Sequence, residues 1–426
     1  MKRLCLVLIS ALFILHCTGE SVLELIHPTD GELVTVPFTF IWSSVENSID
    51  YRIEVDTDIA FSSPVIATDV SDTTYDAANL DTLMYYWRVA AYDENDGLGG
   101  FTDPDSFRVT GSAYPRNFLT AITVLSSAHS IDITPNGNEV WVNHNGQYDT
   151  MVYVISTVTN QVTHQIPVSG SDGAELQITQ DGQFAYFCAG SDHAGIVEIN
   201  TSTHTHTRTF NFYVYSWPEG PDGYGIATTQ NNSDIFAAHA AADYGYGCIT
   251  KFNVSTGALI DSTHLPWICD VALNHAGTKL YAVSESDDIF YEIDPATLTV
   301  TNQMSVLSNP RYLAITADDD YAFISHLNSE MIYVVDLNAF SLVTTIDATS
   351  GHGHLRFTPD QKYLYALNHA TRTMNIIDVS NPSSPFIVEN LNLGGSYGAL
   401  KSICFSPDGM RAYIVASQGN IVVLTR

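Results

Sequence analysis

Basic residues are scarce in this sequence. The 426 residues include 16 Lys and Arg against 47 Asp and Glu, which gives a formal net charge of −31 at pH 7. Binding to nucleic acid through its phosphates requires a basic surface, and so does electrostatic docking on an anionic membrane. The composition therefore argues against both kinds of partner. Because the hydrophobic fraction is an ordinary 45%, the chain can still bury a large core.

Cysteine is also sparse, and no two cysteines form a C-x-x-C pair. This spacing gives no signal of a zinc site, and the absence of C-x-x-C-H removes the attachment point of a c-type haem, so we expect no cofactor. The sequence favours small, buried and unpaired residues at the four cysteines deep in the chain. A disulfide stays open as an alternative, with Cys248 and Cys269 as the nearest pair. The four are Cys188, Cys248, Cys269 and Cys404.

Long apolar runs are limited to one, from Leu4 to Leu15, which follows two basic residues. It is too short to span a bilayer and has the shape of a secretory signal. Together with Cys17, it resembles a bacterial lipoprotein signal, which implies removal of residues 1–16 and a lipid on Cys17. Ordinary cleavage near Gly19 remains the alternative. Both predict export, to the cell envelope or beyond it, and the lipid would be the only membrane attachment.

Aromatic and β-branched residues are abundant, which favours β-structure. Residues 21–110 alternate in short strands between turns, as expected of a two-sheet sandwich. Trp42, Tyr51-Arg-Ile and Tyr86-Trp-Arg-Val resemble a fibronectin type III domain of the bacterial surface kind, and this implies a spacer or adhesive module. Asp56, Asp58 and residues 93–96 offer carboxylates for Ca²⁺, but solvated loop carboxylates are the favoured interpretation.

Residues 119–426 repeat one pattern seven times: an apolar strand, a polar turn and an aromatic-bearing strand. The turn begins at a Thr, Ser or Asn that recurs at intervals of 42 to 50 residues. With two further strands per unit, this period predicts a seven-bladed β-propeller. The recurring residues are Thr134, Thr179, Thr229, Asn274, Thr316, Thr358 and Ser406.

The last unit has only three strands, and residues 118–127 are left over before the first unit. We expect this segment to pair beside residues 420–426 and close the ring, since closure removes exposed sheet edges. The predicted fold is therefore all-β, with a fibronectin type III-like sandwich (21–110), a linker (111–117) and a seven-bladed propeller (118–426).

The units YALNHATRTMNIIDVSNP and FSPDGMRAYIVASQGNIVVL resemble the YVTN-type propeller repeat of exported bacterial and archaeal proteins. This resemblance covers residues 119–426. It implies the fold and says little of activity, because such repeats occur in cell-surface proteins and binding modules, and more distant seven-bladed propellers include lactonases and redox enzymes.

Two columns of inner-strand residues, four and two places before the recurring residue, are expected to face the central channel. The column two places before it contains Asp132, Gln177, Ala227, Ala272, Ala314, Arg356 and Cys404. Alternation along each inner strand turns apolar residues toward the neighbouring blades and polar residues toward the channel. The column four places before the recurring residue contains Ser130, Glu175, Gly225, Asp270, Tyr312, His354 and Ser402. The residues just above it are His129, Tyr224, Cys269, Arg311 and Lys401. Trp217, Trp267 and Tyr397 are further aromatic candidates for the rim.

Ligands of propellers usually lie at this channel mouth, so we predict that Glu175, Trp267, Asp270, Arg311, His354 and Arg356 bind any ligand. Arg356 has a structural alternative, an ion pair with Asp132 or Glu175. His352 and His354, with Asp270 and Glu175, are weaker candidates for a divalent cation. His144, His239 and His326 close second strands, and we expect them to bond loop backbone rather than a metal, because second strands stand too far from the axis.

No nucleophile motif is present, so the sequence favours a monomeric, non-catalytic binding or scaffolding protein for protein or carbohydrate ligands. The alternative is an envelope hydrolase or lactonase at the channel mouth, in which Glu175, Asp270 and His354 serve as general acid–base groups and hold a bound cation.

Overall fold

The computed structural model describes residues 22–78, 80–81, 83–93, 97–124, 127–144, 151–168, 175–189, 195–212, 222–241, 246–348, 352–368, 372–394 and 397–426. All regular elements within these ranges are β-strands, and none is a helix that could cross a bilayer. Contacts divide the chain into two units, with the boundary between Ala113 and Tyr114, inside the range predicted as a linker. The first 16 residues and Cys17 lie outside the described ranges.

The first unit is a sandwich of two sheets. Its core is aromatic: Trp42 and Trp87 are both buried, with ring centroids 6.5 Å apart. One sheet has the order β1 (Leu25–His27), β3 (Phe38–Trp42) and β6 (Thr74–Ala77). The other has the order β2 (Glu32–Val36), β9 (Asp105–Ser112), β7 (Met84–Asp93), β4 (Ser48–Asp56) and β5 (Ile66–Val70), with β8 (Gly97–Leu98) beside β7.

The loop carboxylates of this unit bond their own backbone. Asp56 accepts from the N–H groups of Asp58 and Ser63, at 3.1 and 3.0 Å. Asp58 accepts from Ala60 N–H and Ser62 Oγ, at 3.0 and 2.7 Å. These bonds fit the favoured interpretation of loop carboxylates better than a Ca²⁺ site. Residues 94–96 lie outside the described ranges.

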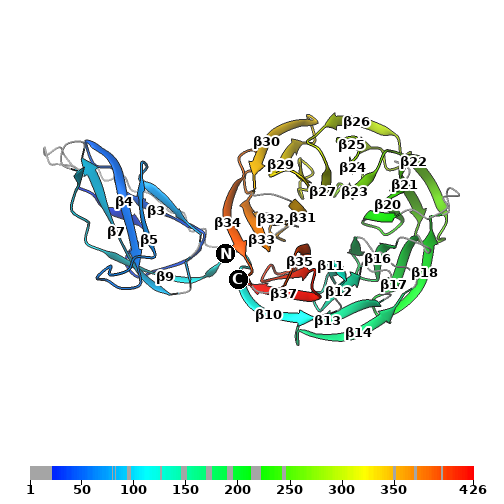
Figure 1. Ribbon diagram of the computed structural model, residues 1–426, viewed down its shortest axis with the longest axis horizontal. Coiled ribbons are helices and arrows are strands. Elements are labelled where there is room, and N and C mark those ends of the chain that lie inside the picture. The colour runs from blue at the N-terminus through cyan, green and yellow to red at the C-terminus, as the bar shows by residue number, and fades with distance from the viewer. Residues whose placement is uncertain are drawn as a thin grey trace, which may run out of the picture. The chain divides into compact units, whose positions relative to one another are not determined.

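The second unit is a ring of blades, and the described residues form seven four-stranded antiparallel sheets (Figure 1). Blades 1 to 3 consist of β11 (Ala128–Ile133), β12 (Glu139–His144), β13 (Met151–Ser156) and β14 (Gln161–Pro167); β15 (Leu176–Ile178), β16 (Phe184–Ala189), β17 (Gly195–Asn200) and β18 (Thr205–Asn211); and β19 (Asp222–Thr228), β20 (Asp234–Ala241), β21 (Tyr246–Asn253) and β22 (Leu259–His264).

Blades 4 to 6 consist of β23 (Ile268–Leu273), β24 (Leu280–Ser284), β25 (Ile289–Ile293) and β26 (Val300–Ser305); β27 (Pro310–Ile315), β28 (Tyr321–His326), β29 (Met331–Asp336) and β30 (Ser341–Asp347); and β31 (His352–Phe357), β32 (Tyr363–Asn368), β33 (Thr373–Asp378) and β34 (Phe386–Asn392). Blade 7 has the order β35 (Leu400–Phe405), β36 (Arg411–Ala416), β37 (Asn420–Thr425) and β10 (Asn117–Thr123).

Blade 7 confirms the predicted closure. The strand β10, cyan in Figure 1, lies against β37, in red, with Ile122 opposite Ile421 and Asn117 opposite Thr425. The chain therefore begins and ends the propeller in one sheet. Residues just before β10 also pack on the propeller: Tyr114 is fully buried and donates to Glu389 at 3.1 Å.

The recurring residue of each repeat shapes the turn between the first two strands. In five of the seven repeats its hydroxyl donates to the side chain two places on, as from Thr134 to Asn136 at 2.7 Å and from Ser406 to Asp408 at 2.6 Å. The same hydroxyl accepts the N–H five places on, at 3.1 Å in the turn of Thr134. These bonds are typical of short side chains that compete with the backbone in turns, and they explain the sequence signal of the repeat.

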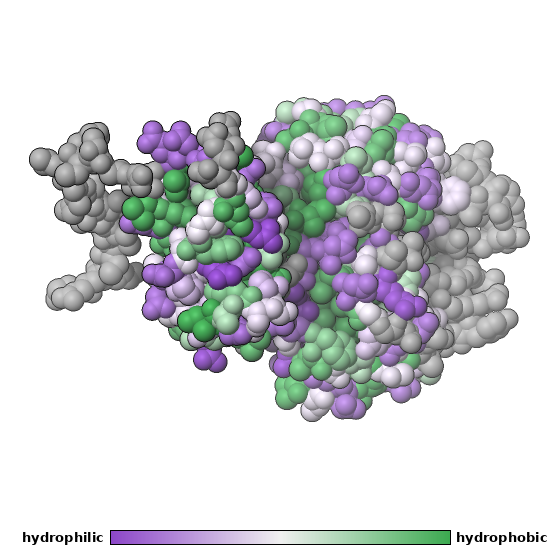
Figure 2. Space-filling view, turned by 60° about the vertical axis from the view of Figure 1, so that its left-hand side comes forward, coloured by the Kyte–Doolittle hydropathy of each residue, from purple (hydrophilic) through white to green (hydrophobic). Residues whose placement is uncertain are grey.

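Apolar residues of neighbouring blades form shared cores. In one cluster, Trp141 and Val154 of blade 1 pack with Leu176 and Phe187 of blade 2. Outer strands are more exposed, and Phe118 and Phe386 on two of them are 55% and 52% exposed. The face seen in Figure 2 mixes hydrophobic and hydrophilic residues.

Candidate site at the channel mouth

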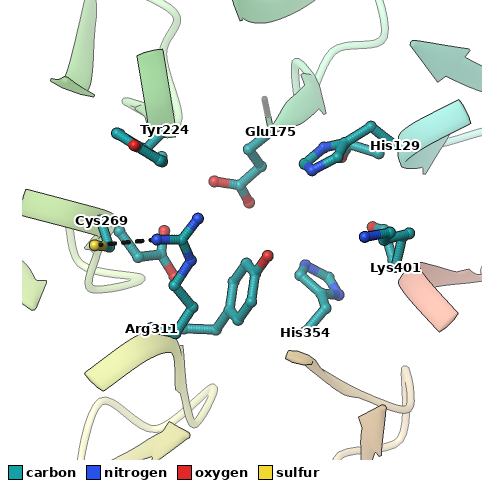
Figure 3. A pocket seen from close by; sticks show the side chains of 12 residues that line it. His129, Glu175, Tyr224, Cys269, Arg311, His354 and Lys401 are labelled. Atoms are coloured by element: carbon teal, nitrogen blue, oxygen red, sulfur yellow. Dashed lines mark hydrogen bonds between the residues drawn. The ribbon is translucent and has the colours of Figure 1, made fainter. Parts of the chain in front are cut away.

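A cavity at one end of the channel is lined by the column four places before the recurring residue and by the residues just above it. Its lining consists of His129, Ser130, Glu175, Tyr224, Gly225, Cys269, Asp270, Arg311, Tyr312, His354, Lys401 and Ser402. Figure 3 shows seven of these side chains around one opening, with the Glu175 carboxylate between Tyr224 and His129. The structure therefore places all twelve of these residues around the mouth, and ligand binding there stays a prediction. The cavity volume is about 30 Å³, enough for roughly two water molecules.

A larger cavity of about 390 Å³ continues deeper along the channel. Glu175, Asp270 and His354 line both cavities and so separate them. The deeper cavity is bordered by Gln177, Arg356 and a column of small residues. That column consists of Ala227, Ala272 and Ala314.

Arg356 and Trp267, two of the six predicted ligand residues, do not line the mouth cavity. Arg356 sits two places farther along its inner strand, lines the deeper cavity, and pairs with Asp132 at 3.1 Å. The predicted structural ion pair is thus present. Trp267 lies in the turn before β23, where its carbonyl accepts from the Glu285 N–H at 3.0 Å.

The acidic residues of the mouth hold neighbouring blades together. An inner strand is the free edge of its sheet, so alternate N–H groups have no partner within the blade. At three of the joints between blades, the side chain four places before the recurring residue of one blade accepts a backbone N–H from the next blade. The donor lies three places before the recurring residue of that next blade. These contacts join Ser130 to Leu176, Glu175 to Ile226 and Asp270 to Leu313, at 3.0, 3.1 and 2.9 Å.

Gly225 belongs to the same column but has no side chain to make such a contact, and this explains the position of Asp270. A Cβ atom at Gly225 would lie 2.6 Å from Asp270 Oδ1 and 2.7 Å from Val271 N. Because Gly225 has no side chain, Asp270 occupies that space and its own Oδ1 accepts the Val271 N–H at 2.9 Å. Both oxygens of Asp270 are thereby bound to backbone.

Burial changes the protonation of the groups between the cavities. It raises the pKa of Glu175 to about 7, and raises that of Asp270 well above its usual value, helped by the nearby Glu175. It lowers the pKa of His354 to about 3, with Arg356 as the next cause. His354 is therefore a neutral imidazole, and its Nδ1 is buried without a hydrogen-bond partner among the described residues.

The basic and thiol groups of the mouth are also engaged. Arg311 Nη1 lies 2.7 Å from Glu285 and 3.5 Å from Cys269 Sγ, and the guanidinium carbon lies 5.0 Å from the Tyr224 ring centroid. The dashed line in Figure 3 marks the contact with Cys269. Arg311, one of the six predicted ligand residues, is thus already paired with Glu285. Burial raises the pKa of Cys269, so its thiol stays protonated.

The remaining cysteines and histidines have structural environments. Cys188, Cys248, Cys269 and Cys404 are buried free thiols, as favoured from the sequence. His144 and His326 each face the backbone carbonyl at the start of the third strand, Met151 and Met331, at 2.9 and 3.0 Å. His239 stacks on Phe212, with centroids 4.4 Å apart.

The predicted cation ligands are not brought together. Within the described ranges, one set of His, Cys, Asp or Glu has donor atoms all within 4.8 Å of one another, and it is Glu139, His164 and His204. Glu175, Asp270 and His354 do not form such a set. Trp217 and the side chain of His352 lie outside the described residues. Tyr397, an aromatic rim candidate, instead stacks on Phe118 at 6.2 Å.

Comparison with known proteins gives a fold and no family. No family model and no curated protein sequence matches the chain. A solved structure titled "Crystal Structure of Mitotic Checkpoint Complex" is similar, with a TM-score of 0.61, 14% identity, 74% of this chain and 93% of that chain covered. Hydrazine synthase from Kuenenia stuttgartiensis is also similar, with a TM-score of 0.60, 16% identity, and 71% and 97% covered. At such low identity, these likenesses establish the propeller fold alone.

Proposed function

We propose that this chain is an exported, envelope-tethered, non-catalytic scaffolding protein whose propeller presents surfaces to protein or carbohydrate ligands. One observation carries the proposal: the carboxylates and hydroxyls of the mouth bind backbone N–H groups of adjacent blades. Because these side chains hydrogen-bond the neighbouring blade, they hold the ring rigid and are less available to a ligand. Propellers commonly serve as such platforms, and the likeness to a checkpoint complex is consistent with an interaction role.

A hydrolase or lactonase at the mouth is the second candidate. Glu175 favours it, because a pKa near 7 suits a general base. The mouth cavity, at about 30 Å³, is far below the 300 Å³ or so of ordinary ligand pockets, whereas the deeper cavity of about 390 Å³, which Glu175, Asp270 and His354 also line, is large enough. Both Asp270 oxygens already accept backbone hydrogen bonds. We therefore favour binding by the outer surface over chemistry inside the mouth.

A hydrolase panel and binding arrays test this choice. Purified protein is incubated with ester, lactone and glycoside substrates, and separately with immobilised glycans and peptides. We expect saturable binding without turnover. Glu175→Gln is the matched variant, because Gln retains an oxygen that can accept from Ile226 N–H. Turnover that disappears in Glu175→Gln, while folding is retained, would establish the hydrolase and overturn the scaffold proposal.

Location has its own test. The lipoprotein-like signal, together with the resemblance of residues 21–110 to a fibronectin type III spacer, supports export and tethering to the cell envelope. We expect wild-type protein in the membrane fraction after export, and Cys17→Ser in a soluble fraction outside the cytoplasm. Cys188→Ser is the control, because it leaves the signal intact. Membrane retention of Cys17→Ser would overturn the lipid anchor, and cytoplasmic wild-type protein would overturn export.

A further inference from the structure

We propose that Glu139, His164 and His204 bind a divalent transition-metal ion, best represented by Zn²⁺, between blades 1 and 2. This inference is independent of the scaffold function. Glu139 begins β12, His164 lies in β14, and His204 ends the turn between β17 and β18. Each supplies one donor atom, and the three atoms all lie within 4.8 Å of one another. Residues far apart in sequence therefore place two imidazoles and a carboxylate together.

His204 occupies a turn position that carries a packed apolar side chain in blades 4 and 5, and Asn160 and Gly257 in blades 1 and 3. Its φ is 54°, and the residues at the same turn position in blades 4 and 5, Leu298 and Phe340, have φ of 51° and 49°. Leu298 is buried in the core shared by blades 3 and 4, and Phe340 stacks on Phe290 of blade 4 at 5.3 Å. At the joint of blades 1 and 2 the same position instead carries a metal-ligating side chain that faces a carboxylate.

The first two ligands are already oriented. His204 Nε2 lies 3.0 and 3.2 Å from the two Glu139 oxygens. The indole of Trp141 stacks on the His204 ring at 5.6 Å, and its Nε1 donates to Glu139 at 3.3 Å. Outer-shell contacts of this kind fix the direction of metal ligands, so little conformational freedom is lost when an ion binds.

His164 completes the set from the solvent side. Its ring stacks on that of His204 with centroids 3.8 Å apart and an angle of 6°. Parallel rings direct their lone pairs side by side, so a shared ion requires one ring to tilt. His164 is exposed, and an exposed side chain rotates at little cost. We therefore expect the His164 ring to tilt toward Glu139 and His204, which stay in place, when an ion binds.

The donor set selects the class of ion. Imidazole nitrogen and one carboxylate suit Zn²⁺ and its transition-metal neighbours, whereas Ca²⁺ and Mg²⁺ prefer all-oxygen sites. Two His and one Glu leave a fourth tetrahedral position for water. The net charge of −31 also favours cations near the surface.

Metal titration of the mature full-length protein, with any affinity tag removed, tests the site. Equilibrium dialysis measures Zn²⁺ stoichiometry, and Co²⁺ absorption reports tetrahedral coordination. We expect one equivalent at micromolar affinity, and at least a tenfold loss of affinity in His164→Ala, whose exposed position spares the fold. Zn²⁺ should also raise the melting temperature of the wild type more than that of His164→Ala.

His275→Ala is the matched control. His275 is an exposed histidine whose Nδ1 lies 3.1 Å from Asp319, but that pair is outside the three-ligand set. We expect its affinity to equal that of the wild type. Glu139→Gln, which keeps an acceptor for Trp141, should also weaken binding at least tenfold. No binding by the wild type, or equal affinity in wild type and His164→Ala, overturns the proposal.

Discussion

The same side chains that mark the channel mouth in sequence serve as acceptors between blades. Ser130, Glu175 and Asp270 each satisfy a backbone N–H that the edge of the next sheet leaves unpaired. A buried N–H without an acceptor costs about 1–3 kcal/mol, so these residues stabilise the ring even though two are carboxylates in poor surroundings for charge. Polar side chains that face the channel are therefore weak evidence for a ligand site.

Glu175 should make stability depend on pH. Its pKa is about 7 in the folded protein and 4.5 ordinarily, because burial penalises the charged form. The folded state retains a proton that the unfolded chain has lost between these values, so its contribution to stability falls as pH rises from about 4.5 to about 7. Glu175→Gln mimics the protonated form. We expect it to be more stable than wild type at pH 8, by up to about 3 kcal/mol.

Urea unfolding of both proteins at pH 4 and pH 8 measures this difference. The two should have nearly equal stability at pH 4, where the wild-type carboxyl is protonated in both states. A difference that stays constant between the two pH values would show that Glu175 does not titrate in this range.

The pair of Arg356 and Asp132 should contribute measurable coupling. The side chains are 44% and 9% exposed, so solvent screens the Arg more than the Asp. Arg356→Ala leaves a buried carboxylate that still accepts the Ile178 N–H at 2.8 Å, and should cost about 1–2 kcal/mol. A double-mutant cycle with Asp132→Asn should give a coupling energy of about 1 kcal/mol in urea unfolding. Additive losses would show that Arg356 contributes nothing through Asp132.

At the level of strands, the repeat was the most predictable feature. The turn hydroxyls, the apolar strands and the shortage of one strand in the last unit are local signals, so the seven sheets and the pairing of β10 with β37 follow from them. The seven residues of the mouth that lie four places before the recurring residue also follow, because alternation within a strand fixes which side faces the channel. The other five directly precede members of this column and border the mouth because they lie near the strand ends.

Contacts between distant segments were not predictable in the same way. Arg356 was predicted at the mouth because the sequence does not show where one cavity ends and the next begins. Arg356 lies two places beyond His354 on its inner strand, and that short distance puts it in the deeper cavity. Glu139, His164 and His204 were missed because they sit on different strands of two blades at no common repeat position. The one available signal was His204 at a turn position where other blades have Leu298 and Phe340.

Close approach of two inner strands should make Gly225 intolerant of a side chain. An added Cβ would meet Asp270 Oδ1 at 2.6 Å and the Val271 backbone nitrogen at 2.7 Å. Backbone cannot yield as a flexible side chain does, so we expect Gly225→Ala to cost about 2 kcal/mol or more in urea unfolding. Gly111→Ala is the control, because nothing lies within 4 Å of its added Cβ. Equal effects of the two substitutions would contradict this account of the joint.

The molecule as a whole consists of two separately packed units. Each has its own buried clusters, and the boundary falls between Ala113 and Tyr114. On the propeller side of the boundary, Arg116 pairs with Glu389 at 2.9 Å and Tyr365 donates to the Pro115 carbonyl at 2.6 Å. Residues 114–117 therefore belong mechanically to the propeller and guide the chain into β10.

Ring closure should dominate the stability of the propeller unit. We expect residues 114–426 to fold alone, because all seven sheets remain complete. Residues 124–426 lack β10 and leave β37 as an exposed edge, so each lost backbone hydrogen bond, worth about 1 kcal/mol, lowers stability. The expected drop in melting temperature is roughly 10 °C, measured by circular dichroism.

Ile122→Ala within residues 114–426 gives an intermediate comparison, because it removes buried side-chain contacts and keeps the strand. It should cost about 2–4 kcal/mol without freeing the edge of β37. The exposed edge is a template for pairing with another chain, so residues 124–426 should also self-associate in sedimentation velocity while Ile122→Ala stays monomeric. Equal melting temperatures for residues 114–426 and 124–426 would contradict this prediction. They would show that the ring is equally stable when blade 7 has only three strands, so that β10 is not needed to close it.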